Sequence, residues 1–291
     1  MKWAYALTLV AFGTAGLATA CGDANSSEPT FYVAGIPDQN AATLARRHDA
    51  LTSYLSRELG VDVRYRPTVS YAATVAAFKR GDVHMAWFGG LTGVQARGIV
   101  PGSLAIAQRP RDAAFRSKFI VRADLEVNNL QQLRGRTFTF GSESSTSGHL
   151  MPRHFLLQAS IDPDTDFKGN PNYSGSHDKT WKLVESGAFQ AGALSEAVWE
   201  AAIEDGKVDT TTVRELFTTP PYYDYNWSIR GDLDTRFGAG FSERAQQALL
   251  NIGQPDQEIL DLYSADGFVE TRNENYEAIR EVAESLGIIR Q

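Results

Sequence analysis

One segment of the sequence has residue types that could bind an anion. Four consecutive hydroxyl side chains, Ser144 to Ser147, stand between Phe140-Gly141, where a short β-type run ends, and Gly148, where a helix is expected to begin. The free N–H groups and the macrodipole of a helix N-terminus can hold an anion without any basic residue. Ser and Thr are also the usual N-caps of helices. The segment therefore leaves two interpretations open, an oxyanion site and a capped helix start.

Arrangements typical of enzymes and metal sites are missing from the sequence. There is no G-x-S-x-G elbow, and no third group can be placed to orient a pair such as Ser147 and His177. None of the five histidines has a partner at a spacing such as H-E-x-x-H. We therefore expect no catalytic residues, no metal and no cofactor.

The composition is that of an ordinary globular protein with more than one lobe. The chain has 291 residues, 43% of them hydrophobic and 22% charged, which argues against disorder and against a polytopic membrane protein. Its net charge is −7, and no basic stripe is visible, so we expect no nucleic-acid partner. An anionic ligand would be repelled at long range, and its binding would have to depend on local dipoles and hydrogen bonds.

The N-terminus has the pattern of an export signal over residues 1–20. A basic Lys2 precedes an apolar run, and the small residues Ala18 to Ala20 precede Cys21, the single cysteine of the chain. This arrangement resembles a bacterial lipoprotein cleavage site, which would make Cys21 the lipidated N-terminus and residues 21–29 a flexible tether. The alternative is ordinary cleavage after Ala20. We favour the lipoprotein, held in the periplasm or at the cell surface.

The first half of the chain alternates between β-type and helical patterns. We expect strands at 31–35, 61–65 and 84–88, with helices over about 44–59 and 71–80 between them. Alternation of this kind predicts a mainly parallel sheet with helices on both faces, whose ligands lie at the carboxyl ends of the strands.

A second α/β unit follows the first. Strands at 103–108 and 118–121 lead out of the first unit, and a strand at 226–230 returns toward it. Between them we expect a short helix at 130–136, a strand at 137–141, a helix from Gly148, a loop over 162–176, a helix at 178–186, a strand at 191–194, a helix to 204 and a strand at 216–219. Helices at 242–250, 257–263 and 273–286 close the chain.

Taken together, these segments resemble one protein family. The motifs that carry the resemblance are Trp87-Phe-Gly-Gly90, Leu130-Gln-Gln-Leu-Arg-Gly-Arg136, Ser145-Thr-Ser-Gly-His-Leu-Met-Pro152, Gly175-Ser-His-Asp178 and Pro220-Pro-Tyr-Tyr-Asp-Tyr-Asn-Trp227. They look like the phosphate, phosphite and phosphonate group of ABC-transporter periplasmic substrate-binding proteins. More narrowly, the chain is similar to a subgroup described as selenate-binding.

The resemblance implies a type II periplasmic binding protein, an α/β fold with two lobes joined by two crossover strands and the ligand in the cleft between them. We expect lobe 1 to comprise residues 30–121 and 226–291, and lobe 2 to comprise residues 122–225. The resemblance also implies a small inorganic oxyanion as ligand, an ABC permease as partner, and a monomer.

The family's binding residues can be carried over by motif. Ser145, Thr146, Ser147 and Gly148 would grip the oxyanion from lobe 2. From lobe 1, Tyr71, Phe88 and Gly89 match pocket positions, although the family has a tyrosine where Phe88 stands. His177 matches a family histidine. Tyr71 could instead pack on the core, and His177 could instead cap a helix.

The crossover segment leaves the ligand chemistry open. The family's acidic residue falls by spacing at Tyr225, with Asp224 next to it, and the position that holds a substrate's amino group falls at Ala197, near Glu196. If Tyr225 faces inward, the pocket supplies only donors and should prefer selenate or sulfate. If Asp224 faces inward, a protonated phosphite or phosphate becomes the better ligand, because a carboxylate accepts an O–H but repels a dianion. We expect the first.

Three functions fit this sequence to different degrees. The favoured one is a binding protein that delivers an oxyanion to an ABC permease and performs no chemistry itself. The second is a periplasmic oxyanion sensor coupled to a membrane histidine kinase, which could use the same pocket. The third, an enzyme, has the least support for the reasons given above.

Overall fold

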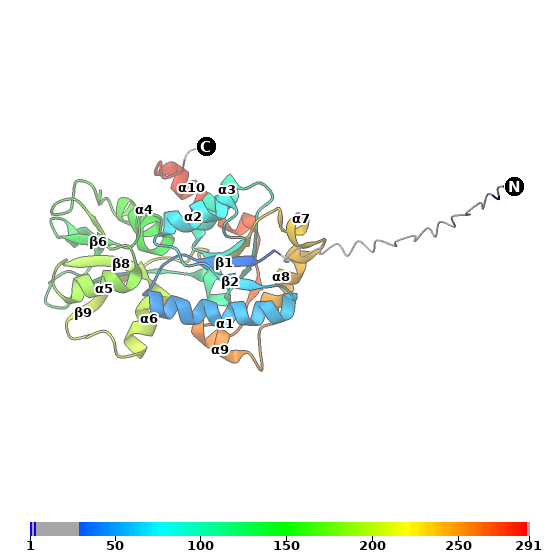
Figure 1. The fold of residues 1–291 in the computed structure, drawn as a ribbon. Coiled ribbons are helices and arrows are strands. Elements are labelled where there is room, and N and C mark those ends of the chain that lie inside the picture. Colours follow the sequence, from blue (N-terminus) through cyan, green and yellow to red (C-terminus); the bar gives the residue numbers. More distant parts are fainter. Residues whose placement is uncertain (2, 4–28, 290–291) are drawn as a thin grey trace.

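The computed structural model describes residues 1, 3 and 29–289 of the chain. Figure 1 shows two groups of elements side by side, one containing β1, β2, α1 to α3 and α7 to α10, the other containing β6, β8, β9 and α4 to α6. Each group is built on its own sheet. This is the two-lobed α/β architecture that the sequence predicted.

The first sheet has six strands in the order β11-β4-β10-β3-β1-β2. Their bounds are β1 Phe31–Gly35, β2 Val63–Tyr65, β3 Met85–Phe88, β4 Leu104–Gln108, β10 Asn226–Ile229 and β11 Val269–Glu270. Strand β1 pairs in parallel with β2 and β3, but β10 runs antiparallel between β3 and β4. The predicted parallel arrangement is therefore confirmed for β1, β2 and β3, while β10, which returns from the second lobe, enters the sheet in the opposite direction.

The second sheet has five strands in the order β7-β6-β8-β5-β9. Their bounds are β5 Ser117–Arg122, β6 Phe138–Phe140, β7 Asn172–Tyr173, β8 Ala191–Ser195 and β9 Val213–Thr218. Strand β6 is parallel to β7 and β8, whereas β5 is antiparallel to β8 and β9. The sequence assigned residues up to 121 to lobe 1, yet β5 pairs throughout its length in the second sheet. The lobe boundary is therefore better placed before Ser117.

The helices cover both sheets. Their bounds are α1 Ala41–Leu59, α2 Tyr71–Arg80, α3 Gly90–Ile99, α4 Met151–Gln158, α5 His177–Glu185, α6 Glu196–Glu204, α7 Leu233–Phe237, α8 Phe241–Leu250, α9 Gln257–Leu262 and α10 Glu277–Ser285. Shorter helical turns occupy Pro110–Ala114, Leu130–Leu133, Thr146–Leu150 and Asn273–Tyr276. Helix α3 was not predicted, because its glycine-rich start and its sequence GLTGVQARGI have low helix propensity. The structure buries most of its residues, so packing outweighs propensity.

Helix α1 illustrates how local sequence and packing agree. Asn40 caps its first turn by accepting the Thr43 N–H, and Gly60 ends it in the left-handed conformation. Its apolar face, with Leu44, Leu51 and Leu55 at helical spacing, belongs to the large core of the first lobe. Three separate hydrophobic clusters are formed by the described residues, one in the first lobe and two against the second sheet.

Two chain segments connect the lobes, and they pair with each other. They run from β4 to β5 and from β9 to β10. Between Phe115 and Tyr222 the backbones exchange two hydrogen bonds, of 2.8 and 2.9 Å, and the Asp224 N–H donates to the Asp112 carbonyl at 3.0 Å. This paired hinge fixes the start of β10, which carries the crossover residues singled out in the sequence.

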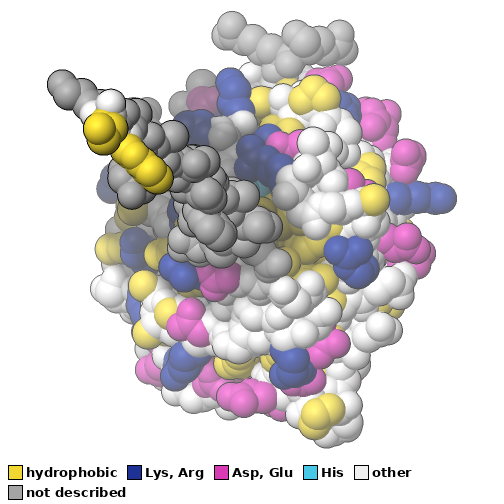
Figure 2. All heavy atoms as spheres, turned by 45° about the vertical axis from the view of Figure 1, so that its right-hand side comes forward, with side chains coloured by type: hydrophobic (Ala, Val, Ile, Leu, Met, Phe, Trp, Pro, Cys, Tyr) yellow, Lys and Arg dark blue, Asp and Glu magenta, His cyan; other side chains and the backbone are white. Residues whose placement is uncertain are grey.

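Apart from residues 1 and 3, the predicted signal peptide lies outside the described residues, as do Cys21 and the tether up to residue 28. None of the helices in the described part of the chain combines the length and the apolar character needed to cross a bilayer. On the face shown in Figure 2, acidic and basic side chains are interspersed rather than gathered into a basic stripe.

Candidate functional site

The hydroxyl-rich segment forms a tight turn between β6 and α4. Ser145 is the N-cap of the turn at Thr146–Leu150, and its Oγ accepts the Gly148 N–H at 2.9 Å. The capping interpretation is therefore correct for Ser145. The N–H groups of Thr146 and Ser147 lie in the first turn, where no earlier carbonyl is available to them, so they are free to face an anion.

Thr146 links the two lobes. Its Oγ1 accepts the N–H of Leu91, in the first turn of α3, at 3.0 Å. A Cβ at Gly89, the N-cap of α3, would lie 3.1 Å from both Thr146 Oγ1 and Asp224 Oδ1. The absence of a side chain at Gly89 therefore allows Thr146 and Asp224 to lie close to the α3 backbone, and the start of α3 packs against the hydroxyl turn.

Asp224 is buried at this junction. Its Oδ1 accepts the Gly90 N–H at 2.9 Å, while its Oδ2 has no hydrogen-bond partner. Burial raises the pKa of Asp224 to about 7, and the nearby Asp112 acts in the same direction, whereas the Gly90 N–H and the hydroxyls of Thr146 and Ser147 oppose the shift. Of the two orientations left open by the sequence, the structure has Asp224 facing the hydroxyl turn. The prediction of a pocket that offers only hydrogen-bond donors is therefore wrong. The predicted preference for selenate or sulfate, which depended on it, loses its basis.

His177 contributes a free donor from lobe 2. It is the first residue of α5, it is fully buried, and its Nδ1 accepts the Ser195 N–H at 3.2 Å. Burial lowers its pKa to about 4, so the ring is neutral and its single proton resides on Nε2. That Nε2 has no hydrogen-bond partner, and a Cβ on Gly148 would lie 3.1 Å from His177 Cε1. The imidazole therefore lies against the hydroxyl turn with a donor unused.

Tyr71 brings a second unused donor, its hydroxyl, from lobe 1. It is the first residue of α2, directly after the N-cap Ser70, and it is buried with no hydrogen-bond partner for its hydroxyl. Burial raises its pKa well above the usual value, and the charges of Asp38 and Asp224 add to the rise, while the neighbouring Ser145 side chain opposes it. The phenol therefore stays protonated and can donate.

We call Tyr71, Ser145, Thr146, Ser147, Gly148, His177 and Asp224 the polar cluster. It combines unused donors with one carboxylate oxygen that lacks a donor. Such a set suits an anion that still carries a proton: the donors meet its charged oxygens, and Asp224 meets its O–H. A fully ionised oxyanion would leave the Asp224 carboxylate facing a like charge.

Besides Gly89, two further predicted site residues, Phe88 and Tyr225, lie beside this cluster. Phe88 is buried at the end of β3 and packs edge-on against Phe78, with ring centroids 5.5 Å apart. Tyr225 stacks on Trp87 at 5.5 Å and has the Arg109 guanidinium over its ring. Phe88 is thus a core residue, and Tyr225 forms the border between the polar cluster and a larger cavity.

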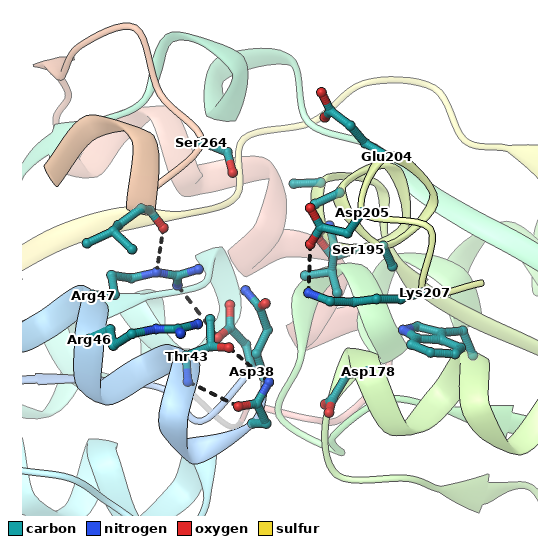
Figure 3. Close-up of a pocket in the computed structure, with 18 of the residues that line it drawn as sticks. Asp38, Thr43, Arg46, Arg47, Asp178, Ser195, Glu204, Asp205, Lys207 and Ser264 are labelled. Carbon is teal, nitrogen blue, oxygen red and sulfur yellow. Dashed lines mark hydrogen bonds and ion pairs between the residues drawn. The ribbon is translucent and has the colours of Figure 1, made fainter. Parts of the chain in front are cut away.

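That cavity lies between the lobes and has a volume of about 700 Å³ (Figure 3). Asp38, Ser195 and Tyr225 line it next to the polar cluster, and α1 and α6 supply charged side chains farther out. Figure 3 shows Arg46 and Arg47 on the α1 side and Glu204, Asp205 and Lys207 on the α6 side. Ala197 also lines this cavity, but Glu196 pairs with Lys118 at 3.4 Å.

Two features of the site were missed in the sequence. The N–H groups of Gly90 and Leu91 were not expected to take part, because α3 was not predicted. Asp38 was not singled out either, although it follows β1 at the carboxyl end of the parallel strands, where ligands of α/β sheets bind. Within the described ranges, no group of three or more His, Cys, Asp or Glu side chains could hold a metal ion.

Comparison with known proteins places this geometry in context. The family model described as "ABC transporter, phosphonate, periplasmic substrate-binding protein" matches residues 33–276. A protein of Prochlorococcus marinus (strain MIT 9301) named "Probable ABC transporter phosphite binding protein PhnD1" is 41% identical over 275 residues, which cover 91% of this chain and 92% of that protein. The "Phosphate-import protein PhnD" of Mycolicibacterium smegmatis is 26% identical over 65% of each chain.

Solved structures agree with the sequence comparison. The structure of PhnD1 from Prochlorococcus marinus in complex with methylphosphonate superimposes with a TM-score of 0.87 and covers 89% of this chain and 99% of that chain. A binding-protein component of a phosphonate ABC transporter from Pseudomonas aeruginosa has a TM-score of 0.78 at 16% identity, which is a likeness of fold alone.

Proposed function

This chain belongs to the phosphonate family of ABC-transporter periplasmic substrate-binding proteins, and from that membership we propose that it captures phosphite or a small phosphonate in the singly protonated state. The relative that is 41% identical is named for phosphite and has been solved with methylphosphonate. Both ligands keep one ionisable O–H on phosphorus in their monoanions, whereas sulfate and selenate carry none at neutral pH.

The observation that carries the proposal is the buried carboxylate of Asp224. Its Oδ2 lacks a donor, and the Gly90 N–H fixes its Oδ1 at 2.9 Å, so the carboxylate is held in one orientation. A ligand O–H would supply the missing donor. This hydrogen bond discriminates between ligands. An oxyanion without a proton would leave the Asp224 carboxylate without a donor and would be repelled by its charge.

Two donor groups complete the binding of the monoanion. The neutral imidazole of His177 and the phenol of Tyr71 each have a proton without an acceptor. They come from different lobes, so an oxyanion between them would stabilise the closed arrangement of the two lobes. Binding therefore depends on short-range donors rather than on the net charge, which is −7.

The test is a calorimetric titration of the purified chain with phosphite, methylphosphonate, sulfate and selenate at pH 7. We expect the two phosphorus ligands to bind and the two dianions to bind at least tenfold more weakly. Tighter binding of sulfate or selenate would refute the proposal. Turnover of any of these ligands would refute the further expectation that the protein performs no chemistry of its own.

The membrane context is also proposed. A member of this family delivers its ligand to an ABC permease, and lipidation of Cys21 would keep the protein near that partner through the tether. We propose that it acts as a monomer. Mass spectrometry of the protein from a membrane fraction tests the anchor: a diacylglyceryl group on Cys21 is expected, and an unmodified N-terminus at Cys21 would contradict it.

A further inference from the structure

Asp38 occupies a position that its sequence context alone does not explain. It lies in the loop between β1 and α1, and its backbone is fixed at both ends: its N–H donates to the Ile36 carbonyl at 2.8 Å, and its carbonyl accepts the His177 N–H at 3.0 Å. This second bond crosses from lobe 1 to lobe 2. The side chain is only 2% exposed, and its Oδ1 has no hydrogen-bond partner. A buried carboxylate oxygen left without a donor is costly to the fold.

The charge of Asp38 is only partly compensated. The nearest cation is Arg47 on α1, whose Nη1 lies 3.9 Å from Asp38 Oδ1, beyond hydrogen-bond distance (Figure 3). Arg47 is held there by other contacts, because its Nε donates to the Leu262 carbonyl at 3.1 Å. Arg109, the other buried cation in this region, is engaged by both carboxylate oxygens of Asp112, at 2.7 and 2.8 Å.

The elements packed around Asp38 include part of the polar cluster. The titratable and charged groups that face it are Tyr65 on β2, Tyr71 on α2, Arg47 on α1, Arg109 before the hinge, His177 on α5, Tyr225 before β10 and Tyr263 after α9. Burial raises the pKa values of Tyr71 and Tyr225, and the charge of Asp38 raises both further. The charge of Asp38 therefore acts on two side chains, Tyr71 and Tyr225, beside the proposed ligand position.

We propose that Asp38 is a specificity-determining residue, a second carboxylate beside the polar cluster that repels ligands in proportion to their charge and so discriminates against sulfate-like dianions. The inference rests on the proposed function, since it concerns the selectivity of the same site. Asp38 differs from Asp224 in its role. Asp224 accepts the proton of the ligand, whereas Asp38 contributes repulsion, and building repulsion against the wrong ligand is a general route to specificity.

Repulsion by one fixed charge predicts how the affinity changes for a monoanion and for a dianion are related. A dianion meets twice the unfavourable energy of a monoanion at the same position, so removing the charge multiplies its affinity by the square of the factor gained by the monoanion. With Arg47 compensating part of the charge, we expect Asp38→Asn to raise phosphite affinity about fivefold and sulfate affinity about 25-fold.

The experiment measures phosphite binding by calorimetry at pH 6, where the monoanion prevails, and sulfate binding by competition against phosphite. It uses the full mature chain as wild type and as Asp38→Asn. Glu204→Gln is the matched control, because it removes the same charge from the rim of the same cavity, where Glu204 is exposed. We expect the control to change the two affinities by less than twofold.

A second variant should change the affinities for phosphite and sulfate in the opposite direction. Arg47→Gln removes the compensating cation while keeping a side chain of similar length, so both affinities should fall and the sulfate affinity should fall more. This variant keeps the inference falsifiable if Asp38→Asn fails to fold, which a melting curve would show.

The outcomes separate the inference from the function on which it rests. Equal factors for phosphite and sulfate in Asp38→Asn, or weaker phosphite binding, would overturn the role of Asp38 and leave the proposed function standing. A wild-type protein that binds neither phosphite nor methylphosphonate would overturn the proposed function itself.

Discussion

Replacing Asp224 by Asn changes one atom of the polar cluster and should invert its ligand preference. The amide oxygen can still accept the Gly90 N–H, which now binds Oδ1 at 2.9 Å, so the amide nitrogen takes the place of Oδ2. The position that accepts a ligand O–H in the wild type then donates instead. Since the side chains have the same shape, the surrounding packing should be preserved.

The size of the effect follows from the contacts. A hydrogen bond to a buried charged group is worth about 1.5–3 kcal/mol, so losing the bond between ligand and Asp224 should weaken phosphite binding about 10- to 150-fold. Sulfate should gain, because two unit charges about 4 Å apart repel by about 4 kcal/mol at an effective dielectric constant of 20, and this repulsion disappears. Because the pKa of Asp224 is about 7, the wild type can escape this repulsion at neutral pH by protonating Asp224. The gain should therefore appear above that pH, and at pH 8.5 we expect sulfate affinity to rise at least about tenfold.

Calorimetric titration of wild type and Asp224→Asn, with phosphite at pH 6, where the monoanion prevails, and with sulfate at pH 8.5, where free Asp224 is ionised, tests this reasoning. Asp261→Asn is a suitable control, because Asp261 is exposed and lines the cavity between the lobes, whereas none of the polar-cluster residues lines that cavity. Phosphite binding that is unchanged in Asp224→Asn, or sulfate binding that is no stronger, would show that Asp224 does not receive a ligand proton.

Further variants and conditions probe the remaining contacts. Thr146→Ala leaves the Leu91 N–H without its acceptor and should weaken phosphite binding by about 1–3 kcal/mol; unchanged calorimetry would remove this contact from the account. His177→Phe should weaken it about 10- to 100-fold by removing the Nε2 donor, and wild-type affinity would exclude that role. Gly148→Ala should weaken it too, since a Cβ there lies 3.0 Å from Ser145 Oγ; tighter binding would contradict the packing. Finally, phosphite affinity should fall as the pH rises above about 7, because Asp224 and the ligand then lose the proton they share; a flat titration from pH 6 to 9 would contradict this sign.

The sequence predicted the elements that carry the site and the parallel pairing of β1, β2 and β3, but not the direction of β10. The strand at 137–141 and the helix from Gly148 follow from local patterns. The structure has β6 at Phe138–Phe140 and a helical turn that begins slightly earlier, at Thr146, and continues into α4. The direction of β10 is set by the hinge pairing of Phe115 with Tyr222, a contact between residues far apart in sequence. Local alternation of strands and helices contains no information about such a pairing.

The orientation of Asp224 shows why the ligand chemistry could not be settled from the sequence. Asp224 and Tyr225 are neighbours in an aromatic run, and both are buried, so neither hydrophobicity nor alternation distinguishes which one faces the cluster. The bond from the Gly90 N–H decides it, and that donor belongs to α3, a helix that propensity does not favour. For Asp38 the sequence offered only its place after the first strand, and its contact with His177 of the second lobe is a property of the fold.

The most direct test of the central claim, that the bound ligand shares one proton with Asp224, is a count of protons taken up on binding. Calorimetry of phosphite binding at pH 8.5, in two buffers of different ionisation enthalpy, gives this number. We predict uptake of about one proton by the wild type, because the free dianion and the ionised Asp224 must gain the proton that the complex retains, and uptake near zero by Asp224→Asn. Binding of phosphite to the wild type with no proton uptake would contradict the account.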